Sequence, residues 1–130
     1  METQSLEDSI RTSIALKLFA NYKKAFQHHV THTTIDKLPL SAFKKGEVHN
    51  FNPARCRGKT AEEAYPPQDR PRGARDISSV KFHQANITRN KLPFIWVAKT
   101  KEGYVLLDGA HRVVAYYLAR RRKVPALVVH

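Results

Sequence analysis

The order of apolar segments near the end of the chain restricts the fold more than any other feature. Residues 94–98 and 104–107 are apolar runs of strand length, and the Lys-Glu-Gly triplet at 101–103 is typical of a hairpin turn. A helical pattern follows over 113–122, and residues 124–129 form a short apolar run that suits a buried strand. Strands and a helix in this order predict an α/β fold.

The corner between the second strand and the helix reads Asp108-Gly109-Ala110-His111-Arg112. Backbone N–H groups at a helix start have no partner within the helix, and the helix dipole favours an anion there. Gly109 allows a sharp turn, and Arg112 offers a planar fork that matches phosphate oxygens. We therefore predict a phosphate site, with Asp108 either capping the helix or holding a divalent cation. The alternative is a polar first turn that is merely solvated.

The first part of the chain contributes two expected elements. Apolar residues at four-residue steps predict an amphipathic helix over 5–27, packed on the domain. A Thr-rich stretch predicts a short strand around 30–36, which Leu38-Pro39-Leu40 then ends.

The middle of the chain has a different character. Proline, glycine and basic residues are frequent over 44–76 and large aliphatic residues are scarce, which predicts a long basic loop with a helical turn at 60–64. Order is expected to return with a short helix over 77–84, for which Asp76 or Ser78 would be the cap.

Charge is the main signal of the composition. Twenty-three Lys and Arg residues stand against eleven Asp and Glu residues, a formal net charge of +12 over 130 residues. This balance favours a polyanionic partner such as nucleic acid or a nucleotide. The length predicts one domain spanning 1–130. The sequence shows neither a signal-peptide pattern nor an apolar run of about 20 residues, so we expect a cytoplasmic protein without a membrane partner.

The basic groups at the end of the last predicted helix exceed what helix capping needs. We expect them and two arginines of the basic loop to contact the phosphates of DNA, which would carry little sequence information. These predicted nucleic-acid contacts are Arg55, Arg57, Arg120, Arg121, Arg122 and Lys123.

The cysteine and histidine pattern does not predict a metal centre. Cys56 is the only cysteine, which excludes an internal disulfide and a cysteine zinc cage. His28, His29 and His32 lie close together without a cysteine or an acidic residue at ligand spacing. We expect no protein metal site.

Residues 103–129, with the sequence GYVLLDGAHRVVAYYLARRRKVPALVV, resemble the ParB/sulfiredoxin superfamily. The strand at 94–97 and a Ser-containing helix before it also fit, so the resemblance covers about 77–130. It implies a compact ParB/sulfiredoxin-like domain, a small mixed sheet with helices, that binds ATP at the Gly turn. Carried over by position, the resemblance assigns the nucleotide phosphates to His111 and Arg112, with Gly109 in the turn. Ala110 and Ser79 are expected to complete the nucleotide-binding site.

The chain also departs from the family. Sulfiredoxins have their catalytic cysteine at the position of Ala110, and Cys56 does not replace it, so sulfinic-acid reduction is not expected. Their ATP-binding lysine has no clear counterpart, and Arg72 and Arg75 are the nearby candidates. The Asp108-Gly109 order resembles ParB-like nucleases and a small-molecule kinase branch.

Three functions compete on these grounds. The first is an ATPase that also cleaves DNA, as in conflict between plasmids or mobile elements. In it Arg112 would stabilise transition-state charge, His111 would stabilise the leaving group or move a proton, and Asp108 would position Mg²⁺ or water. The second is a non-catalytic, nucleotide-switched DNA-binding module for partition or regulation. The third is a small-molecule kinase, which the basic charge disfavours.

Overall fold

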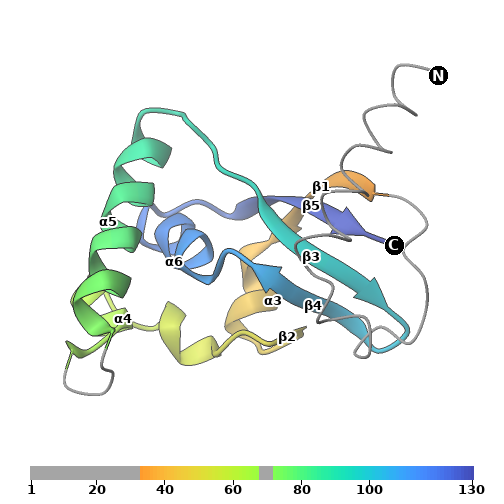
Figure 1. The fold of residues 1–130 in the computed structure, drawn as a ribbon, viewed down its shortest axis with the longest axis horizontal. Helices are drawn as coiled ribbons and strands as arrows, with labels where there is room; N and C mark the ends of the chain where they lie inside the picture. The colour runs from red at the N-terminus through yellow and green to blue at the C-terminus, as the bar shows by residue number, and fades with distance from the viewer. Residues whose placement is uncertain (1–32, 68–71) are drawn as a thin grey trace.

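A five-stranded mixed sheet organises the part of the chain that the computed structural model describes, residues 33–67 and 72–130 (Figure 1). The strand order is β1-β5-β3-β4-β2. β5 runs antiparallel to β1 and parallel to β3, and β4 runs antiparallel to β3 and parallel to β2. The strands are β1 (Thr33–Pro39), β2 (Val48–His49), β3 (Ile95–Thr100), β4 (Gly103–Asp108) and β5 (Lys123–Val129). The expected mixed α/β architecture is confirmed, and the helix expected over 5–27 lies outside the described residues.

The predicted hairpin is present as β3 and β4, and β5 matches the expected buried strand. β1 extends further than expected, because Pro39 still pairs in register with Lys123. A proline removes one N–H donor, which an edge strand tolerates because one side of it has no neighbouring strand. β1 is such an edge strand in the observed order.

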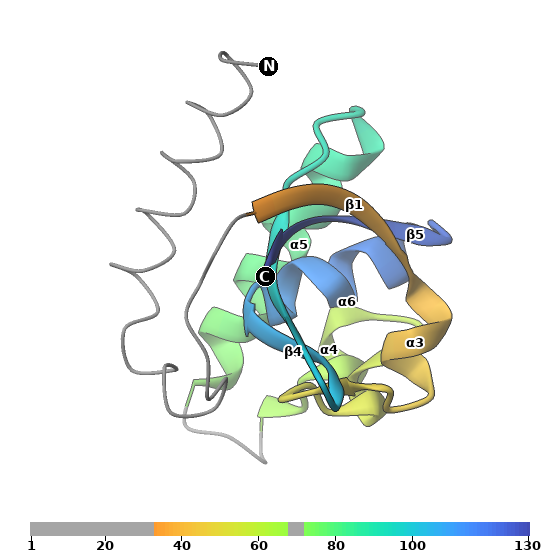
Figure 2. The same cartoon turned by 90° about the vertical axis from the view of Figure 1, so that its right-hand side faces the viewer.

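The described helices share one core on one face of the sheet. They are α3 (Leu40–Lys44), the 3-10 helix η2 (Pro53–Cys56), α4 (Ala61–Ala64), α5 (Gly73–Thr88) and α6 (Ala110–Leu118). Each contributes buried side chains to the same cluster as Ile95 and Val97 of β3. α6 packs against both α5 and the sheet, and Figures 1 and 2 show it between them. A smaller apolar cluster around Ala98 and Leu107 forms on the opposite face of the strands.

Two helices have other bounds than the sequence predicted. α6 covers 110–118 instead of 113–122, because Arg120 takes a left-handed conformation (φ 59°) and the Arg121 N–H bonds the carbonyl of Tyr116. Such a closure ends a helix by satisfying its last carbonyls. α5 covers 73–88 instead of 77–84, so Asp76 lies inside the helix and does not cap it.

The prediction of a long loop over 44–76 is only partly right, because short helices and a strand interrupt the stretch. β2, η2, α4 and the first turn of α5 lie within it, and α4 confirms the expected helical turn. Side chains cap the short helices: the Asn52 Oδ1 accepts from the Ala54 N–H at 3.0 Å, and the Thr60 Oγ1 accepts from the Glu63 N–H at 3.1 Å. Buried Phe51 and small residues give this stretch a core without aliphatic periodicity.

Candidate functional site

The predicted corner is a tight turn between β4 and α6. Gly109 separates the two elements with φ 116° and ψ 23°, a conformation that favours glycine. A Cβ at this position would lie 2.7 Å from the Ile95 Cγ2. Gly109 therefore permits both the turn and the close approach of the turn to β3, which places the start of α6 beside the sheet.

A cavity of about 270 Å³ opens at this corner. α5 supplies two of its lining residues and the corner supplies the other five. The lining residues are Ser79, His83, Asp108, Gly109, Ala110, His111 and Arg112. The structure thus gathers the corner residues and Ser79 around one space, although Ser79 is about 30 residues away in the sequence.

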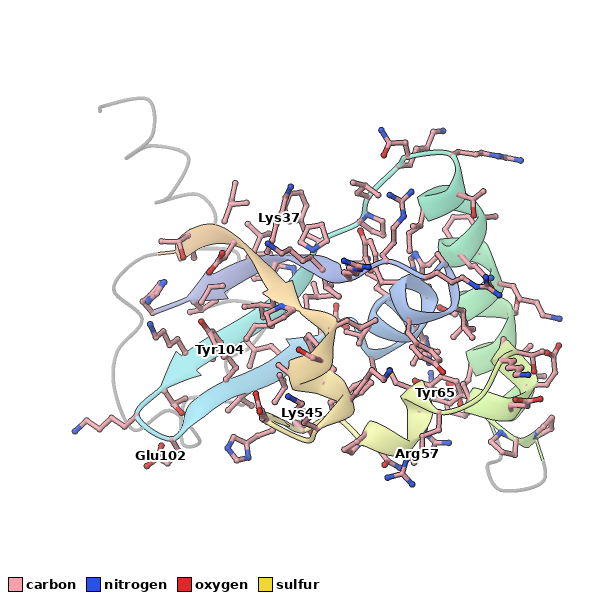
Figure 3. The ribbon with its side chains drawn as sticks, turned by 180° about the vertical axis from the view of Figure 1, so that it is seen from behind. Lys37, Lys45, Arg57, Tyr65, Glu102 and Tyr104 are labelled. Carbon is pink, nitrogen blue, oxygen red and sulfur yellow. The ribbon has the colours of Figure 1, made fainter. Side chains whose placement is uncertain are left out.

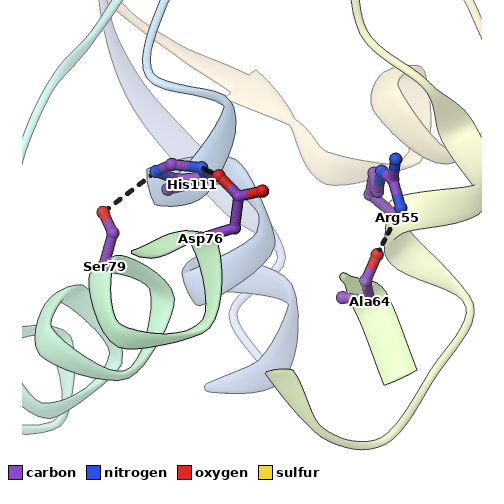
Figure 4. Close-up of polar contacts among 5 residues, drawn as sticks. All are labelled: Arg55, Ala64, Asp76, Ser79 and His111. Atoms are coloured by element: carbon purple, nitrogen blue, oxygen red, sulfur yellow. Dashed lines mark hydrogen bonds and ion pairs between the residues drawn. The ribbon is translucent and has the colours of Figure 1, made fainter. Parts of the chain in front are cut away.

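His111 is held by both of its ring nitrogens (Figure 4). Its Nε2 lies 2.8 Å from the Asp76 Oδ1, and its Nδ1 lies 3.0 Å from the Ser79 Oγ. The Tyr65 ring packs edge-on against the imidazole, with centroids 5.2 Å apart. An ionised carboxylate only accepts hydrogen bonds, so Nε2 donates to Asp76. In the neutral ring, Nδ1 then carries the lone pair and accepts from the Ser79 hydroxyl.

Like His83, which lines the cavity, Asp76 is a site residue that the sequence reasoning missed. It was expected only as a helix cap, whereas its side chain is buried, with 1% exposure, and contacts His111. The usable signal was the three-residue spacing of Asp76 and Ser79, which puts both on one face of a helix. That signal required α5 to begin at Gly73, before the expected start.

Arg112 reaches from the first turn of α6 toward the start of β3. Its Nη1 donates to the carbonyl of Phe94 at 2.6 Å, and no carboxylate of the described residues pairs with it. A guanidinium has five N–H donors, so most of the fork remains available beside the cavity. Asp108 is exposed, where a cation bound to phosphates could reach it.

His83 brings a further titratable group to the cavity. Burial lowers the pKa of its imidazole, and the positive charges of Arg112 and His111 lower that pKa further. Its Nδ1 is buried without a hydrogen-bond partner among the described residues. Beyond burial, the lowered pKa reflects the cationic groups that face His83, and a bound anion would offset their charge.

Arg55 does not have the exposed position expected of a DNA contact. Its Nη1 donates to the carbonyl of Ala64 at 2.8 Å, and its guanidinium lies 4.7 Å from the ring centroid of Tyr65. Because Tyr65 in turn packs on His111, Arg55 supports the wall behind the site. Arg57, by contrast, is exposed (Figure 3).

The other predicted nucleic-acid contacts lie in the turn between α6 and β5 and at the first residue of β5. Arg120, Arg122 and Lys123 are exposed. Arg121 is also exposed, but its Nη2 donates to the carbonyl of Ile87 at 3.1 Å and so ties the turn to the end of α5. Among the residues that the structure describes, the side chains of Arg120, Arg122 and Lys123 therefore have no contact of this kind.

Cys56 and the two candidate arginines are outside the cavity. Cys56 is buried, with 2% exposure, and burial raises the pKa of its thiol to about 12, against a smaller opposing effect of Lys44. A thiol in this state is a poor nucleophile. Arg72 occupies the N-cap position of α5 without a capping hydrogen bond from its side chain, and Arg75 lines a neighbouring open hollow that shares Ser79 with the cavity.

Comparisons with models of known protein families, with curated proteins and with solved structures gave no match for this chain. Within residues 33–67 and 72–130, no helix is both long and apolar enough to span a bilayer. The same residues contain no group of three or more His, Cys, Asp or Glu side chains arranged to hold a metal ion.

Proposed function

We propose that this protein is a ParB/sulfiredoxin-like domain that binds ATP at the start of α6, hydrolyses its terminal phosphate and cleaves DNA. One observation supports this more than any other: the cavity combines Arg112 with the first N–H groups of α6. These N–H groups precede the first bond of the helix, from the Val113 N–H to the Gly109 carbonyl at 3.0 Å. Such donors and the helix dipole favour a phosphate.

The residues of the cavity divide the chemistry between them. Arg112 and the α6 N–H groups would stabilise the charge that develops on a transferring phosphoryl group. His111, fixed by Asp76, would accept a proton from the attacking group. Mg²⁺ would neutralise phosphate charge when bound, and the exposed Asp108 carboxylate would hold it.

The position of the free cations supports an action on DNA. β5 runs parallel to β3 and antiparallel to β4, so β5 begins at the end of the sheet where β4 finishes. Arg120, Arg122 and Lys123 therefore lie at the same end of the sheet as the cavity. A DNA strand bound by these side chains would pass near His111 and Arg112, which would act on its phosphodiester.

Arg112→Ala tests the phosphate site. We expect its ATP affinity to fall about 10- to 100-fold, since a charged hydrogen bond contributes about 1.5–3 kcal/mol. Arg89→Ala is the matched control, because Arg89 is exposed at the end of α5 and its loss changes the net charge equally. Equal affinities of the Arg112 variant and the wild type would refute the assignment.

Activity assays separate the two functional classes. Purified protein is incubated with labelled ATP and, separately, with plasmid DNA, each with and without Mg²⁺. Release of phosphate and nicking of the plasmid support the enzyme. Binding of DNA at low salt without either cleavage would instead support the non-catalytic, nucleotide-switched module.

A further inference from the structure

Three side chains from two helices form a Ser–His–Asp relay at the wall of the cavity (Figure 4). The Ser79 Oγ lies 3.0 Å from the His111 Nδ1, and the His111 Nε2 lies 2.8 Å from the Asp76 Oδ1. Both distances are within the range in which a nucleophile, a base and an orienting carboxylate cooperate. The order of the three groups is that of an activated serine.

We propose that Ser79 is the nucleophile of this site and is phosphorylated during turnover, an inference that rests on the proposed hydrolysis of ATP. A serine hydroxyl is weak at its ordinary pKa and needs an adjacent base. His111 meets this need, because its Nε2–H is engaged with Asp76 and its Nδ1 faces the hydroxyl. Asp76 is buried, so it orients the imidazole and is a positioning residue.

The surroundings of Ser79 suit an attack on a bound phosphate. Ser79 lines the cavity together with Arg112 and the start of α6, which would hold the phosphate oxygens. It also lines the neighbouring hollow along α5. The Tyr65 ring fixes the imidazole by packing edge-on against it. The nucleophile, the base and the groups that would hold the phosphate oxygens, which a two-step phosphoryl transfer needs, therefore lie around one cavity.

In the first step the Ser79 Oγ attacks the terminal phosphorus of ATP. The Oγ–P bond forms, the P–O bond to ADP breaks, ADP leaves with the electron pair, and the hydroxyl proton passes to the His111 Nδ1 and then to solvent or ADP. In the second step water attacks the phosphoserine and gives its proton to Nδ1. The P–Oγ bond then breaks and Oγ recovers a proton from Nδ1. The sum is ATP and water to ADP and phosphate.

The stereochemical course at phosphorus is the decisive measurement. Wild-type protein with Mg²⁺ is given ATP whose terminal phosphorus is made chiral by sulfur and oxygen isotopes. Two successive in-line displacements give net retention of configuration, whereas direct attack by water gives inversion. We expect retention. After an acid quench, we also expect labelled phosphate on the peptide that contains Ser79, because phosphoserine survives acid and phosphohistidine does not.

Ser79→Ala provides a second readout. We expect its turnover to fall by at least about 10³-fold, as when a nucleophile of a catalytic triad is removed, while ATP affinity changes only a few-fold. Ser78→Ala is the matched control, because Ser78 is the adjacent residue of α5 and, unlike Ser79, makes no hydrogen bond to His111 within the described residues. The stereochemical measurement uses the wild type and does not depend on how well the variants fold.

Each other outcome is decisive. Inversion, or full activity of Ser79→Ala, overturns the nucleophile while ATP hydrolysis stands. Retention with acid-labile phosphate on His111 also overturns it. Absence of ATP hydrolysis in the wild type overturns the proposed function and this inference together.

Discussion

Two constraints favour glycine at position 109, the positive φ angle and the short distance to Ile95, and a matched pair of variants can separate them. Gly109 and Gly103 have nearly equal φ values of 116° and 118°, but an added Cβ would lie 2.7 Å from the Ile95 Cγ2 at the first and 3.9 Å from the Glu47 carbonyl oxygen at the second. Backbone strain should cost either alanine variant about 1–3 kcal/mol. Gly109→Ala should lose about 1–3 kcal/mol more, because Ile95 is fully buried and cannot move freely.

Denaturant unfolding of Gly109→Ala and Gly103→Ala measures this difference. ATP affinity should fall only in the Gly109 variant, because Gly103 lies at the far end of the hairpin. Equal destabilisation of the two variants would show that the contact with Ile95 does not restrict the corner.

His83 should make stability depend on pH in one direction. Burial, followed by the charges of Arg112 and His111, lowers the pKa of His83 below its ordinary 6.5 in the folded protein. As the pH falls, His83 therefore takes up a proton in the unfolded chain before it does so in the folded protein. The stability that neutral His83 contributes is complete above about pH 6.5 and declines as the pH falls toward the folded pKa. His83→Gln should lack this decline. Unfolding free energies of both proteins at several pH values between 7 and 5 test the sign.

The same imidazole reports on the anion site. Inorganic phosphate in the cavity would offset the charge of Arg112 and raise the pKa of His83, which an NMR titration of the ring protons measures. Sodium chloride of equal ionic strength is the control. If the pKa of His83 is the same in phosphate and in chloride, phosphate does not bind in this cavity.

At the scale of elements, the sequence predicted those parts whose pattern is local. The β3–β4 hairpin, β5 and the α4 turn follow from apolar runs and turn residues. The stretch from 44 to 76 could not be predicted in this way, because its buried residues Phe51, Cys56 and Tyr65 follow no helical or strand period. The corner at Gly109 was predictable from its residues, whereas Asp76 required knowing that α5 packs on α6.

Arg55 shows how the stretch from 44 to 76, which was expected to be a loop, supports the site. Arg55 bonds the Ala64 carbonyl and lies over the Tyr65 ring with one planar guanidinium, and the single ammonium of lysine would not make both contacts at once. Arg55→Lys keeps the charge, so a DNA contact would survive it. We expect instead a loss of about 1–2 kcal/mol of stability with little change in DNA affinity at constant salt.

Thermal or denaturant unfolding checks this expectation. Arg57→Lys is the control, because Arg57 lies two residues after Arg55, is exposed and should tolerate the change. An unchanged stability of Arg55→Lys together with weaker DNA binding would return Arg55 to the set of phosphate contacts.

At the scale of the whole molecule, the distribution of charge matters more than its sum of +12. Arg120, Arg122 and Lys123 lie at the end of the sheet that holds the cavity. Lys45, Lys99 and Lys101 are exposed at the opposite end, because Lys99 pairs with Tyr104 at the start of β4 and β2 runs beside that start. Two triple variants to glutamine therefore remove equal charge from opposite ends.

The salt dependence of DNA affinity distinguishes a local surface from general attraction. Each phosphate contact contributes about 0.9 to the slope of log affinity against log salt. Replacing Arg120, Arg122 and Lys123 should lower the magnitude of the slope by about 2 to 3 and slow plasmid cleavage. Replacing Lys45, Lys99 and Lys101 should leave the slope nearly unchanged, because phosphates bound beside the cavity lie far from that end. If the slope falls equally in both variants, net charge alone attracts DNA. The proposal that the cavity acts on DNA would then be refuted, whereas the proposal that it binds a nucleotide would be unaffected.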